Sequence, residues 1–505
     1  MNVQGFSVYD MLVRNAQVYG NRPALVHPEG ALTFSELLAR VDALATGLQG
    51  HSLNQGDRVC ILAQNHAAYV ELYGACAKLG LIAYPVNWRL TPEELEVIFD
   101  RAEPRMVVVD ESTQAQVADW PTRKKNIPYW YQFGATAGES FTPFGNLYIG
   151  GGAEPAPKIG SDDSFAVIST AAVDIVPRGA VLTHGNIMAS NIQTMALMGL
   201  TQEDAYLLCL PLYHIAALGN AFAVMHAGGT NVLMTRFDPD EAVRLIDAHG
   251  VTFVSGFAPI LENILDAAEK AGSKLTSIHH ATGLENPDSI KRLIALTGAT
   301  FWAGFGQSET TGFISLQNLA DKPGAAGKPA PLCQVRLVDE EENDVPVGEP
   351  GEIVVRGPLV MKEYFAQPEV TAHTFRRGWH HTGDLGKFDE EGYLYYAGRK
   401  PEKELIKPGG ENVYPVEVER VIAEINGVKA VCVFGVPDKQ WGEAIKAVVE
   451  PDAGVTLEAQ QVIDHVGGRI ARFKKPKVVE FTDAMPLTAG GEIDRAAVKL
   501  KWGKA

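Results

Sequence analysis

Helix and strand patterns alternate along the first part of this chain, and this alternation constrains the fold more than any other feature of the sequence. Thr33 and Glu36 have the spacing of a helix capping box, and apolar residues recur behind them at helical intervals. Residues 58–63 and 106–109 are largely apolar runs with the length of buried strands. Alternating elements of this kind predict a layered α/β domain.

The length of the chain indicates more than one hydrophobic core. With 505 residues it exceeds an ordinary single domain, so two or more cores are expected. Residues 120–160 mix polar and apolar side chains with scattered proline and glycine, which predicts a loop-rich insertion without chemistry of its own.

The balance of charged and apolar residues excludes several classes of partner. The formal net charge is −17 and no basic stripe compensates it, which argues against nucleic acid or an anionic membrane surface. No apolar run reaches the roughly 18 residues of a membrane span, and the N-terminal segment does not resemble a signal peptide. The five cysteines lie far apart and predict buried thiols in a reducing compartment. We therefore expect a cytoplasmic enzyme.

Residues 378–415 contain the pattern that is most informative about chemistry. A Thr-Gly-Asp turn ending at Asp384 and a Gly-Arg pair ending at Arg399 flank a tyrosine-rich strand pattern. Asp384, expected at the surface as a turn residue, could accept hydrogen bonds from a diol, and Arg399 could donate a planar fork to the same ligand. The charged residues 400–404 have the character of a hinge. By itself, this stretch is equally compatible with a surface hairpin followed by a polar linker.

Together with a Gly-Gly-Glu-Asn loop at 409–412, these motifs resemble the ribose-binding and hinge motifs of the AMP-forming acyl- and aryl-CoA synthetases. That adenylating superfamily also includes luciferases and peptide-synthetase adenylation domains, and the resemblance extends over essentially the whole chain. It implies a large N-terminal α/β domain of several subdomains, residues 1–399, and a small mobile C-terminal α+β domain, residues 400–505. It places the hinge at Lys403 and Glu404, after a two-residue insertion, and assigns Asp384 and Arg399 to the ribose.

The family's phosphate loop corresponds to residues 169–179. The resemblance implies that Ser169, Thr170 and Arg178 contact the phosphates of ATP, with a catalytic role for Thr170 as well. The centre of the loop departs from the family pattern, because β-branched residues stand where glycines usually supply positive φ angles. Asp174 would also place a carboxylate near the phosphates.

An aromatic-Gly-x-Ser-Glu run ends at Glu309 and resembles the family signature with Thr in place of Ser. In this resemblance Phe305 stacks on the adenine, Ser308 bonds the α-phosphate, and Glu309 is the catalytic carboxylate that holds Mg²⁺, which prefers hard oxygen ligands. Gly306 and Gln307 complete the nucleotide contacts of this run. By itself, the run also fits a capped helix start after a glycine turn.

The Leu-Pro-Leu-Tyr-His run that ends at His214 matches the motif that presents a gating side chain to the acyl pocket. A lone histidine among apolar residues is more often part of a core, and only the resemblance favours the pocket. Ala258 and Gly304 are implied to line the same pocket, while Gly283 and Leu284 are assigned by position to the backbone beside the adenine and acyl group. Small residues after His214 leave room for an aromatic, alicyclic or medium-chain fatty acid.

The last motif departs most from the family. It normally reads Pro-x-Thr-x-x-Gly-Lys-Ile-x-Arg, and its lysine bridges the carboxylate and the α-phosphate during adenylation. Here every landmark of residues 486–495 is present except this catalytic lysine, which is Glu492.

The resemblance implies an acid:CoA ligase that uses ATP, Mg²⁺ and coenzyme A. Such an enzyme forms an acyl-adenylate, then swings its C-terminal domain and transfers the acyl group to the CoA thiol. Gly409 and Gly410 would let the backbone approach the pantetheine arm closely. Glu492 and the altered phosphate loop leave open an adenylation-impaired relative that binds acyl-adenylate or acyl-CoA, or performs only the thioester-forming half-reaction. A luciferase-like oxygenase also stays open, and a homodimer is expected without a specific signal.

Overall fold

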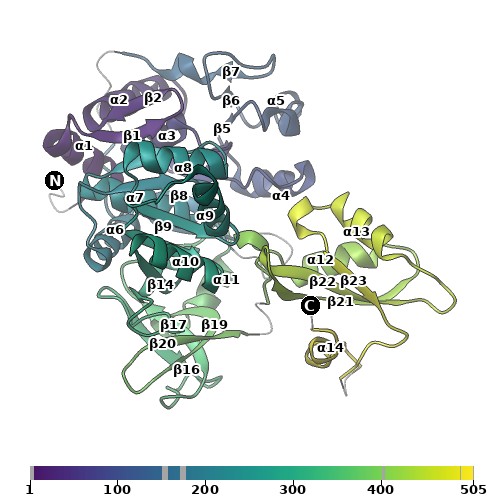
Figure 1. The fold of residues 1–505 in the computed structure, drawn as a ribbon. Coiled ribbons are helices and arrows are strands. Elements are labelled where there is room, and N and C mark those ends of the chain that lie inside the picture. Colours follow the sequence, from purple (N-terminus) through teal and green to yellow (C-terminus); the bar gives the residue numbers. More distant parts are fainter. Residues whose placement is uncertain (1–4, 151–156, 171–177, 401–403, 489–490, 504–505) are drawn as a thin grey trace.

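The computed structural model describes residues 5–150, 157–170, 178–400, 404–488 and 491–503. Figure 1 shows a large N-terminal domain in purple to green and a small C-terminal domain in yellow-green to yellow. The predicted class, a large α/β domain with a small α+β domain, is confirmed by this arrangement.

An eight-stranded sheet of the described residues has the order β15-β14-β13-β12-β10-β11-β1-β2. The strands from β14 to β1 are parallel, and the two edge strands are antiparallel to their neighbours. The strand bounds in this order are Gly312–Asn318, Thr300–Gln307, His280–Leu284, Phe253–Phe257, Ala205–Leu208, Thr230–Leu233, Pro23–His27 and Gly30–Thr33. The parallel strands therefore end at one common edge, where ligands of open α/β sheets usually bind.

A second sheet of eight described strands has the order β18-β9-β8-β4-β3-β5-β6-β7. Its strand bounds in this order are Glu363–Tyr364, Gly179–Thr183, Ser164–Ser169, Ile82–Pro85, Arg58–Leu62, Met106–Val109, Tyr129–Gln132 and Thr142–Pro143. Strands β3 and β5 confirm the two apolar runs. The expectation of a loop-rich insertion at 120–160 is wrong in part, because β6 pairs in parallel with β5 and most of it is buried.

Helices join the two sheets and cover their outer faces (Figure 1). One hydrophobic cluster links both sheets with α1 (Val8–Tyr19), α2 (Phe34–Gln49), α3 (Ala67–Leu79), α6 (His184–Met198) and α7 (Ile215–Ala227). The first sheet is covered by α8 (Pro239–His249), α9 (Ile260–Ala271) and α10 (Pro287–Thr297), and the second by α4 (Pro92–Ala102) and α5 (Trp120–Arg123). The predicted capping box is present, with the Thr33 amide donating to Glu36 Oε2 at 2.8 Å and the Glu36 amide to Thr33 Oγ1 at 3.2 Å.

A four-stranded antiparallel sheet completes the large domain, in the order β16-β17-β19-β20. Its strands are Gln334–Val338, Gly351–Arg356, His380–Phe388 and Leu394–Arg399, with α11 (Pro368–Thr374) before β19. It encloses a small core of its own. The hairpin of β19 and β20 carries the Thr-Gly-Asp and Gly-Arg motifs.

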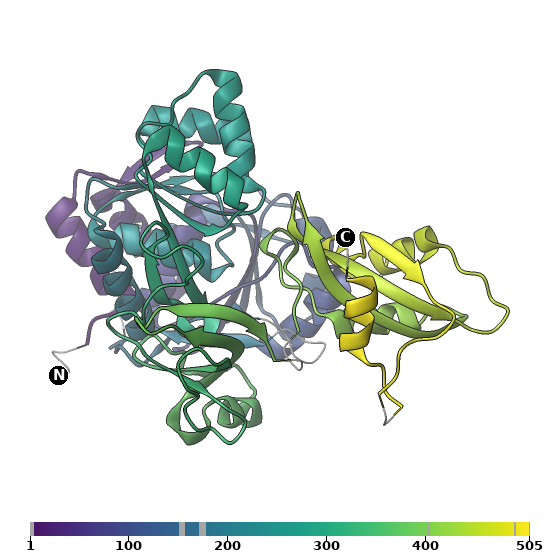
Figure 2. The same cartoon turned by 60° about the horizontal axis from the view of Figure 1, so that its bottom comes forward.

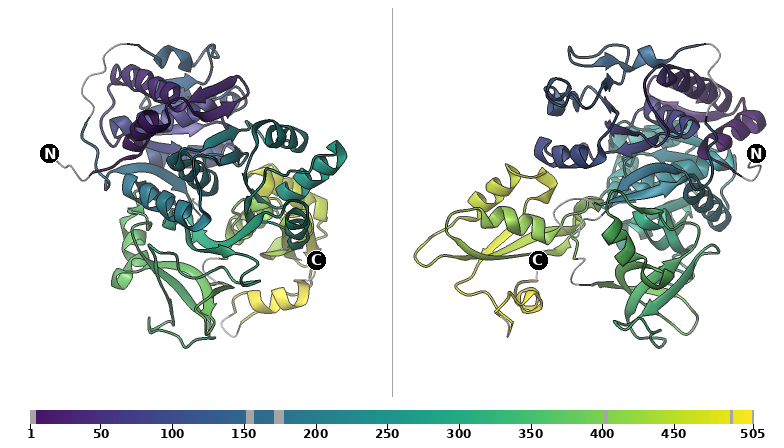
Figure 3. Two further views of the ribbon diagram at one scale, coloured as in Figure 1. Left: turned by 60° about the vertical axis from the view of Figure 1, so that its left-hand side comes forward. Right: turned by 180° about the vertical axis from the view of Figure 1, so that it is seen from behind.

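The small domain is built on a three-stranded sheet, β21-β22-β23, which the views of Figures 2 and 3 show apart from the large domain's sheets. Its strands are Val428–Asp438, Gly442–Pro451 and Val478–Phe481. Helices α12 (Pro415–Ala423) and α13 (Ala459–Gly467) pack on one face, and α14 (Arg495–Trp502) packs on the other. This domain therefore has two hydrophobic clusters of its own, and Ala471 and Phe473 connect it to a cluster of the large domain.

Candidate active site

Asp384 and Arg399 are directly opposite each other on β19 and β20. Arg399 Nε donates to Asp384 Oδ1 at 2.7 Å, and the Tyr396 hydroxyl donates to the same oxygen at 3.2 Å. The Gln307 side-chain amide donates to Asp384 Oδ2 and, at 3.1 Å, to the Thr382 carbonyl. Only 3% of Asp384 is exposed, so the expectation of a surface turn residue is wrong. The structure brings the two predicted ribose residues together as an ion pair with a buried carboxylate and a partly exposed guanidinium.

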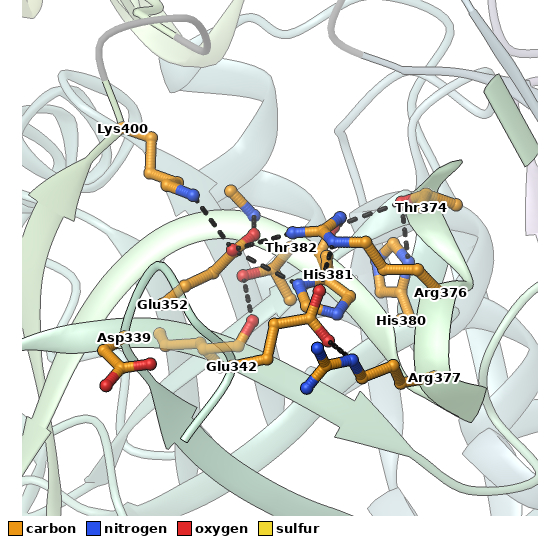
Figure 4. Close-up of polar contacts among 12 residues, drawn as sticks. Asp339, Glu342, Glu352, Thr374, Arg376, Arg377, His380, His381, Thr382 and Lys400 are labelled. Atoms are coloured by element: carbon orange, nitrogen blue, oxygen red, sulfur yellow. Dashed lines mark hydrogen bonds and ion pairs between the residues drawn. The ribbon is translucent and has the colours of Figure 1, made fainter. Parts of the chain in front are cut away.

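Glu352 of β17 supports the turn that carries Asp384 (Figure 4). Its carboxylate accepts from the Gly383 amide at 3.0 Å, from His381 Nδ1 at 3.2 Å and from Lys400 Nζ at 3.2 Å. Burial alone would raise the pKa of Glu352, but His381 and Lys400 outweigh burial and hold it at about 2. The turn is therefore held by a carboxylate that stays ionised. The same carboxylate binds Lys400, the first residue of the predicted hinge.

Two aromatic rings lie next to the Asp384–Arg399 pair. Phe305, at the end of β14, stacks on Tyr396 with 6.1 Å between ring centroids and 25° between planes. Tyr396 is half exposed, at 50%. Sequence reasoning singled out Phe305 but missed Tyr396 as a site residue, although its place in the tyrosine-rich strand, three residues before Arg399, was a usable signal.

Glu309 lies directly after β14, in η3 (Ser308–Thr310), and is 7% exposed. Its Oε1 accepts from the hydroxyl of buried Tyr364 at 2.9 Å. The Arg178 guanidinium lies over the Tyr364 ring, 5.4 Å from its centroid. Burial, and then the charge of Glu309, raise the pKa of Tyr364 well above its ordinary value, so this hydroxyl stays a donor. The structure therefore links the predicted carboxylate to the predicted phosphate-binding arginine.

The described ends of the predicted phosphate loop form the base of a hairpin. Ser169 of β8 is opposite Gly179 of β9, and the buried Thr170 donates its amide to the Arg178 carbonyl at 2.7 Å. Residues 171–177, which include Asp174 and the β-branched centre of the loop, lie outside the described residues. Ser169, Thr170 and Arg178 thus stand together at one edge of the second sheet.

The predicted acyl-pocket residues lie at the carboxyl ends of the first sheet. His214 precedes α7 and has its ring 6.4 Å from that of Phe257, whose neighbour Ala258 donates its amide to the Leu284 carbonyl at 2.8 Å. Leu284 is 57% exposed. Gly283 has φ +135°, and a Cβ there would stand 1.8 Å from the Gly256 carbonyl oxygen, so a side chain is excluded.

Gly304 and Gly306 belong to the stretch of β14 that pairs with β15. A Cβ on Gly304 would stand 2.6 Å from the Ser315 carbonyl oxygen. Glycine is therefore needed at position 304 for the packing of β14 against β15, independently of any contact with an acyl group.

The glycine loop of the small domain lies against this same edge. A Cβ on Gly410, at φ +85°, would stand 2.4 Å from Phe257 Cγ, and Gly409 donates its amide to the Trp441 carbonyl at 3.0 Å. A Cβ on Gly409 would stand 3.7 Å from the Ala258 carbonyl oxygen. Only Gly410 is thus required by close approach of the two domains, because the nearest atom to a Cβ on Gly409 would be Trp441 Cε3 of its own domain, at 2.9 Å.

Glu411, the next residue of the loop, reaches into the large domain. Its carboxylate accepts from the Tyr213 hydroxyl at 3.0 Å, from Arg89 Nη1 at 3.0 Å and from Asn87 Nδ2 at 2.9 Å. His214 Nε2 is 3.6 Å away. Burial alone would raise the pKa of Glu411, but His214, Arg89 and Tyr213 outweigh burial and hold it at about 2. Sequence reasoning quoted Glu411 within a motif without giving it a role.

Lys407 is a further residue that sequence reasoning missed. Its amide donates to Glu443 Oε2 at 2.6 Å. Burial, and then the positive charge of Arg399, lower the pKa of its ammonium to about 8, against the opposing influence of Asp384, Glu443 and Glu309. A lysine that titrates near neutrality within the range of these charges is a candidate functional group.

The structure does not bring Glu492 to the other predicted site residues. Glu492 is exposed in a turn in which the Thr488 amide donates to its carbonyl at 2.7 Å. Glu404 accepts from Arg495 Nε at 3.0 Å and pairs with Lys499 Nζ at 2.6 Å, which ties the end of the predicted hinge to α14. Lys403 lies outside the described residues.

Two kinds of feature are absent from the described residues. Among the described residues no three His, Cys, Asp or Glu side chains cluster as a metal site. The described helices include none with both the length and the apolar character required to cross a membrane.

Comparison with known proteins matches two family profiles, the AMP-binding enzyme over residues 12–365 and the AMP-binding enzyme C-terminal domain over residues 417–492. Feruloyl-CoA synthase of an Amycolatopsis species is 34% identical over 498 residues, 97% of this chain and 98% of the relative. Indoleacetate–CoA ligase of Aromatoleum aromaticum is 32% identical and covers 96% of both chains.

The third similar protein is o-succinylbenzoate CoA synthetase from Bacillus subtilis, which has been solved in two states. A double mutant bound with its product analogue is 28% identical, covers 99% of this chain and 100% of its own, and superposes with a TM-score of 0.85. The same enzyme with its acyl-adenylate intermediate, also 28% identical and covering 98% and 99%, superposes with a TM-score of only 0.70. Because coverage is nearly complete in both cases, the lower TM-score of the acyl-adenylate complex reflects a different arrangement of the chain and not a shorter alignment.

Proposed function

The chain belongs to the family of AMP-binding enzymes, and from this premise we propose that it is an AMP-forming carboxylic acid:CoA ligase. One observation carries the proposal: Gly410 of the small domain lies on Phe257, at the same sheet edge as the end of β14 and its neighbouring Asp384–Arg399 pair. The residues that we assign to the nucleotide and a glycine-lined approach to them therefore lie close together. The relatives named above catalyse CoA ligation, and nothing among them favours the adenylation-impaired alternative.

In the first half-reaction, a carboxylate oxygen of the acid attacks the α-phosphorus of ATP and pyrophosphate leaves, which gives an acyl-adenylate. We assign the ribose to Asp384 and Arg399, and the adenine to the face of Phe305. Ser169, Thr170, Arg178 and Ser308 are assigned to the phosphates. Since the amide of Gln307 is engaged by Asp384, its role is to orient that carboxylate.

In the second half-reaction, the CoA sulfur attacks the acyl carbonyl carbon, the bond to AMP breaks, and the thiol proton passes to solvent. We propose that the pantetheine arm passes Gly409 and Gly410, and that His214, Ala258 and Gly304 border the acyl group. The domain orientation supports this assignment, because the match is better to the product-analogue complex than to the acyl-adenylate complex. Glu492 is exposed in this orientation, as expected for a residue of the first half-reaction.

Mg²⁺ is a proposed cofactor, and Glu309 fits it. Mg²⁺ usually binds through one or two carboxylates together with substrate phosphates, so a protein cage of several ligands is not required. Within the described parts of the chain, Glu309 Oε1 accepts from Tyr364, while Oε2 accepts no hydrogen bond. When bound, the ion would stabilise the negative charge that develops on the phosphates.

Three further assignments are proposals of the same kind. The domain boundary is placed at 399/400 and the hinge at Lys403 and Glu404. In support, Lys400 is still bound to Glu352 of the large domain, whereas Glu404 is already bound to α14 of the small domain. A cytoplasmic location is proposed because all five cysteines are free thiols and four are buried. The homodimer stays a prediction that sedimentation velocity would test.

The test is product analysis. The protein is incubated with ATP, Mg²⁺, CoA and single acids from a panel of ferulate, indoleacetate and octanoate, and acyl-CoA and AMP are quantified by mass spectrometry. We expect equal amounts of AMP and acyl-CoA with at least one class of acid. AMP release without thioester, or no product from any acid or its synthetic adenylate, would contradict the proposal.

A further inference from the structure

A buried ion triad joins the two domains at a distance from the nucleotide residues. Lys474 Nζ of the small domain lies 2.7 Å from Glu417 Oε1 of α12 and 2.5 Å from Glu94 Oε1 of α4, in the large domain. The side chains of Lys474, Glu94 and Glu417 are 5%, 14% and 8% exposed. One ammonium thus pairs with two carboxylates, Glu417 of its own domain and Glu94 of the other domain.

The carboxylate of Glu94 is held in place by its own helix. Glu94 Oε2 accepts from the Thr91 amide at 2.7 Å in the capping box of α4. The same oxygen accepts from the Ala471 amide of the small domain at 3.2 Å. Because Thr91 and Glu94 are on one element, the carboxylate keeps its position whether or not the small domain is present. It is a preformed docking point with one oxygen for an ammonium and one for an amide.

Apolar contact surrounds this docking point. Ala471 is buried within the hydrophobic cluster of the large domain that includes Leu90 and Leu95, beside Glu94. Phe473 packs against both this cluster and the cluster of the small domain. The ion pair between Glu94 and Lys474 is therefore shielded from water, which strengthens it and also makes its loss costly.

The two carboxylates of the triad maintain the charge of Lys474, whereas burial raises the pKa of Glu417 in spite of Lys474. Burial alone would lower the pKa of Lys474, but Glu417 and Glu94 outweigh burial and raise it. Lys474 therefore stays charged at every physiological pH. When the small domain leaves α4, Lys474 keeps Glu417 but loses Glu94, and the Ala471 amide loses its acceptor. The contact with Glu94 occurs here together with the placement of Gly410 on Phe257.

We propose that Glu94 and Lys474 are positioning residues that hold the small domain in place for the thioester-forming half-reaction. The inference rests on the proposed ligase function and extends it to residues outside the site. Neither side chain touches a reacting atom. Their pairing favours the orientation that places the glycine loop at the acyl group, and it must break before the domain can turn for adenylation.

The experiment compares Glu94→Gln with the matched control Glu93→Gln on the same helix. Glutamine retains the oxygen that caps α4 but loses the charge, and Glu93 is exposed. Acyl-CoA formation is followed in single turnovers from synthetic adenylates of ferulate, indoleacetate and octanoate with CoA, using the adenylate that wild type consumes fastest. ATP affinity and melting temperature are measured in parallel.

We expect thioester formation by Glu94→Gln to slow by about tenfold or more, equivalent to ~1.4 kcal/mol, with ATP affinity nearly unchanged. Lys474→Arg should keep most of the rate and Lys474→Met should lose it, since only arginine preserves the charge. Wild-type rates in Glu94→Gln, or equal losses of thioester formation and ATP affinity, would overturn the positioning role. A wild-type protein that consumes none of the adenylates would instead overturn the ligase function itself.

Discussion

Replacing Asp384 by alanine tests the proposed nucleotide site most directly. The substitution removes the carboxylate that accepts from Arg399, Tyr396 and Gln307 and leaves the Arg399 guanidinium without its counter-ion. Breaking a buried pair costs ~3–5 kcal/mol, and since the Arg399 side chain is 20% exposed we expect a loss of ~2–3 kcal/mol in unfolding free energy. Two charge-assisted hydrogen bonds to ribose hydroxyls contribute ~1.5–3 kcal/mol each, so ATP affinity should fall by about 10²- to 10⁴-fold.

The double variant Asp384→Ala/Arg399→Met separates these two effects. It removes the unpaired buried charge, so it should recover most of the lost unfolding free energy without recovering ATP binding. Chemical denaturation measures the first quantity, and calorimetric titration with ATP and Mg²⁺ measures the second. A folded Asp384→Ala protein with wild-type ATP affinity would remove Asp384 from the nucleotide site and refute the assignment.

Three other residues give separate predictions. Glu492→Lys should raise the rate of pyrophosphate release by about tenfold or more, because in the proposed adenylation orientation a cation would replace an anion beside the α-phosphate. Thioester formation from a preformed adenylate should be unchanged, and a fall in pyrophosphate release would contradict this prediction. The lowering of the Glu411 pKa from 4.5 to about 2 corresponds to ~3 kcal/mol of net interaction with its charged form. Glu411→Gln should therefore slow thioester formation by up to about 100-fold. Glu458→Gln, a change at an exposed glutamate of the same domain, is the control. Because the pKa of Glu411 is lowered, its charge contributes fully to the domain contact above pH 4.5, and this contribution is lost as the pH falls toward 2. A wild-type rate in Glu411→Gln would argue against this role. Lys407 loses its charge as the pH rises through about 8, so the thioester rate should fall there in wild type and not in Lys407→Met; identical pH profiles would exclude a role for its charge.

The parts of the fold that depend on local sequence could be predicted. Thr33 and Glu36 are three residues apart, and their capping box needs no information from elsewhere in the chain. Asp384 and Arg399 belong to neighbouring strands of one hairpin, so their motif spacing was sufficient to place them together. The burial of Asp384 was not predictable in this way, because Glu352 and Gln307, which enclose it, come from other sheets or strands.

The contacts between the domains lay beyond sequence reasoning for a physical reason. Glu411 binds Arg89 across more than 300 residues, and Lys474 binds Glu94 across a still longer separation. Each of these side chains looks locally like an ordinary surface charge, and its partner across the domain interface is not evident from the neighbouring sequence. Similarly, β6 has a short mixed sequence that is stabilised as a strand by pairing with β5.

The most direct test of the whole account is a single-turnover experiment on the wild-type protein with a synthetic acyl-adenylate and CoA. The domain orientation, with Gly410 on Phe257 and Glu492 exposed, predicts that acyl-CoA and AMP form in equal amounts without added ATP. The rate should exceed that of Glu94→Gln and Glu411→Gln, whose domain contacts are weakened. Hydrolysis of the adenylate to free acid, with no thioester from any acid class, would contradict the central claim that this protein ligates carboxylic acids to coenzyme A.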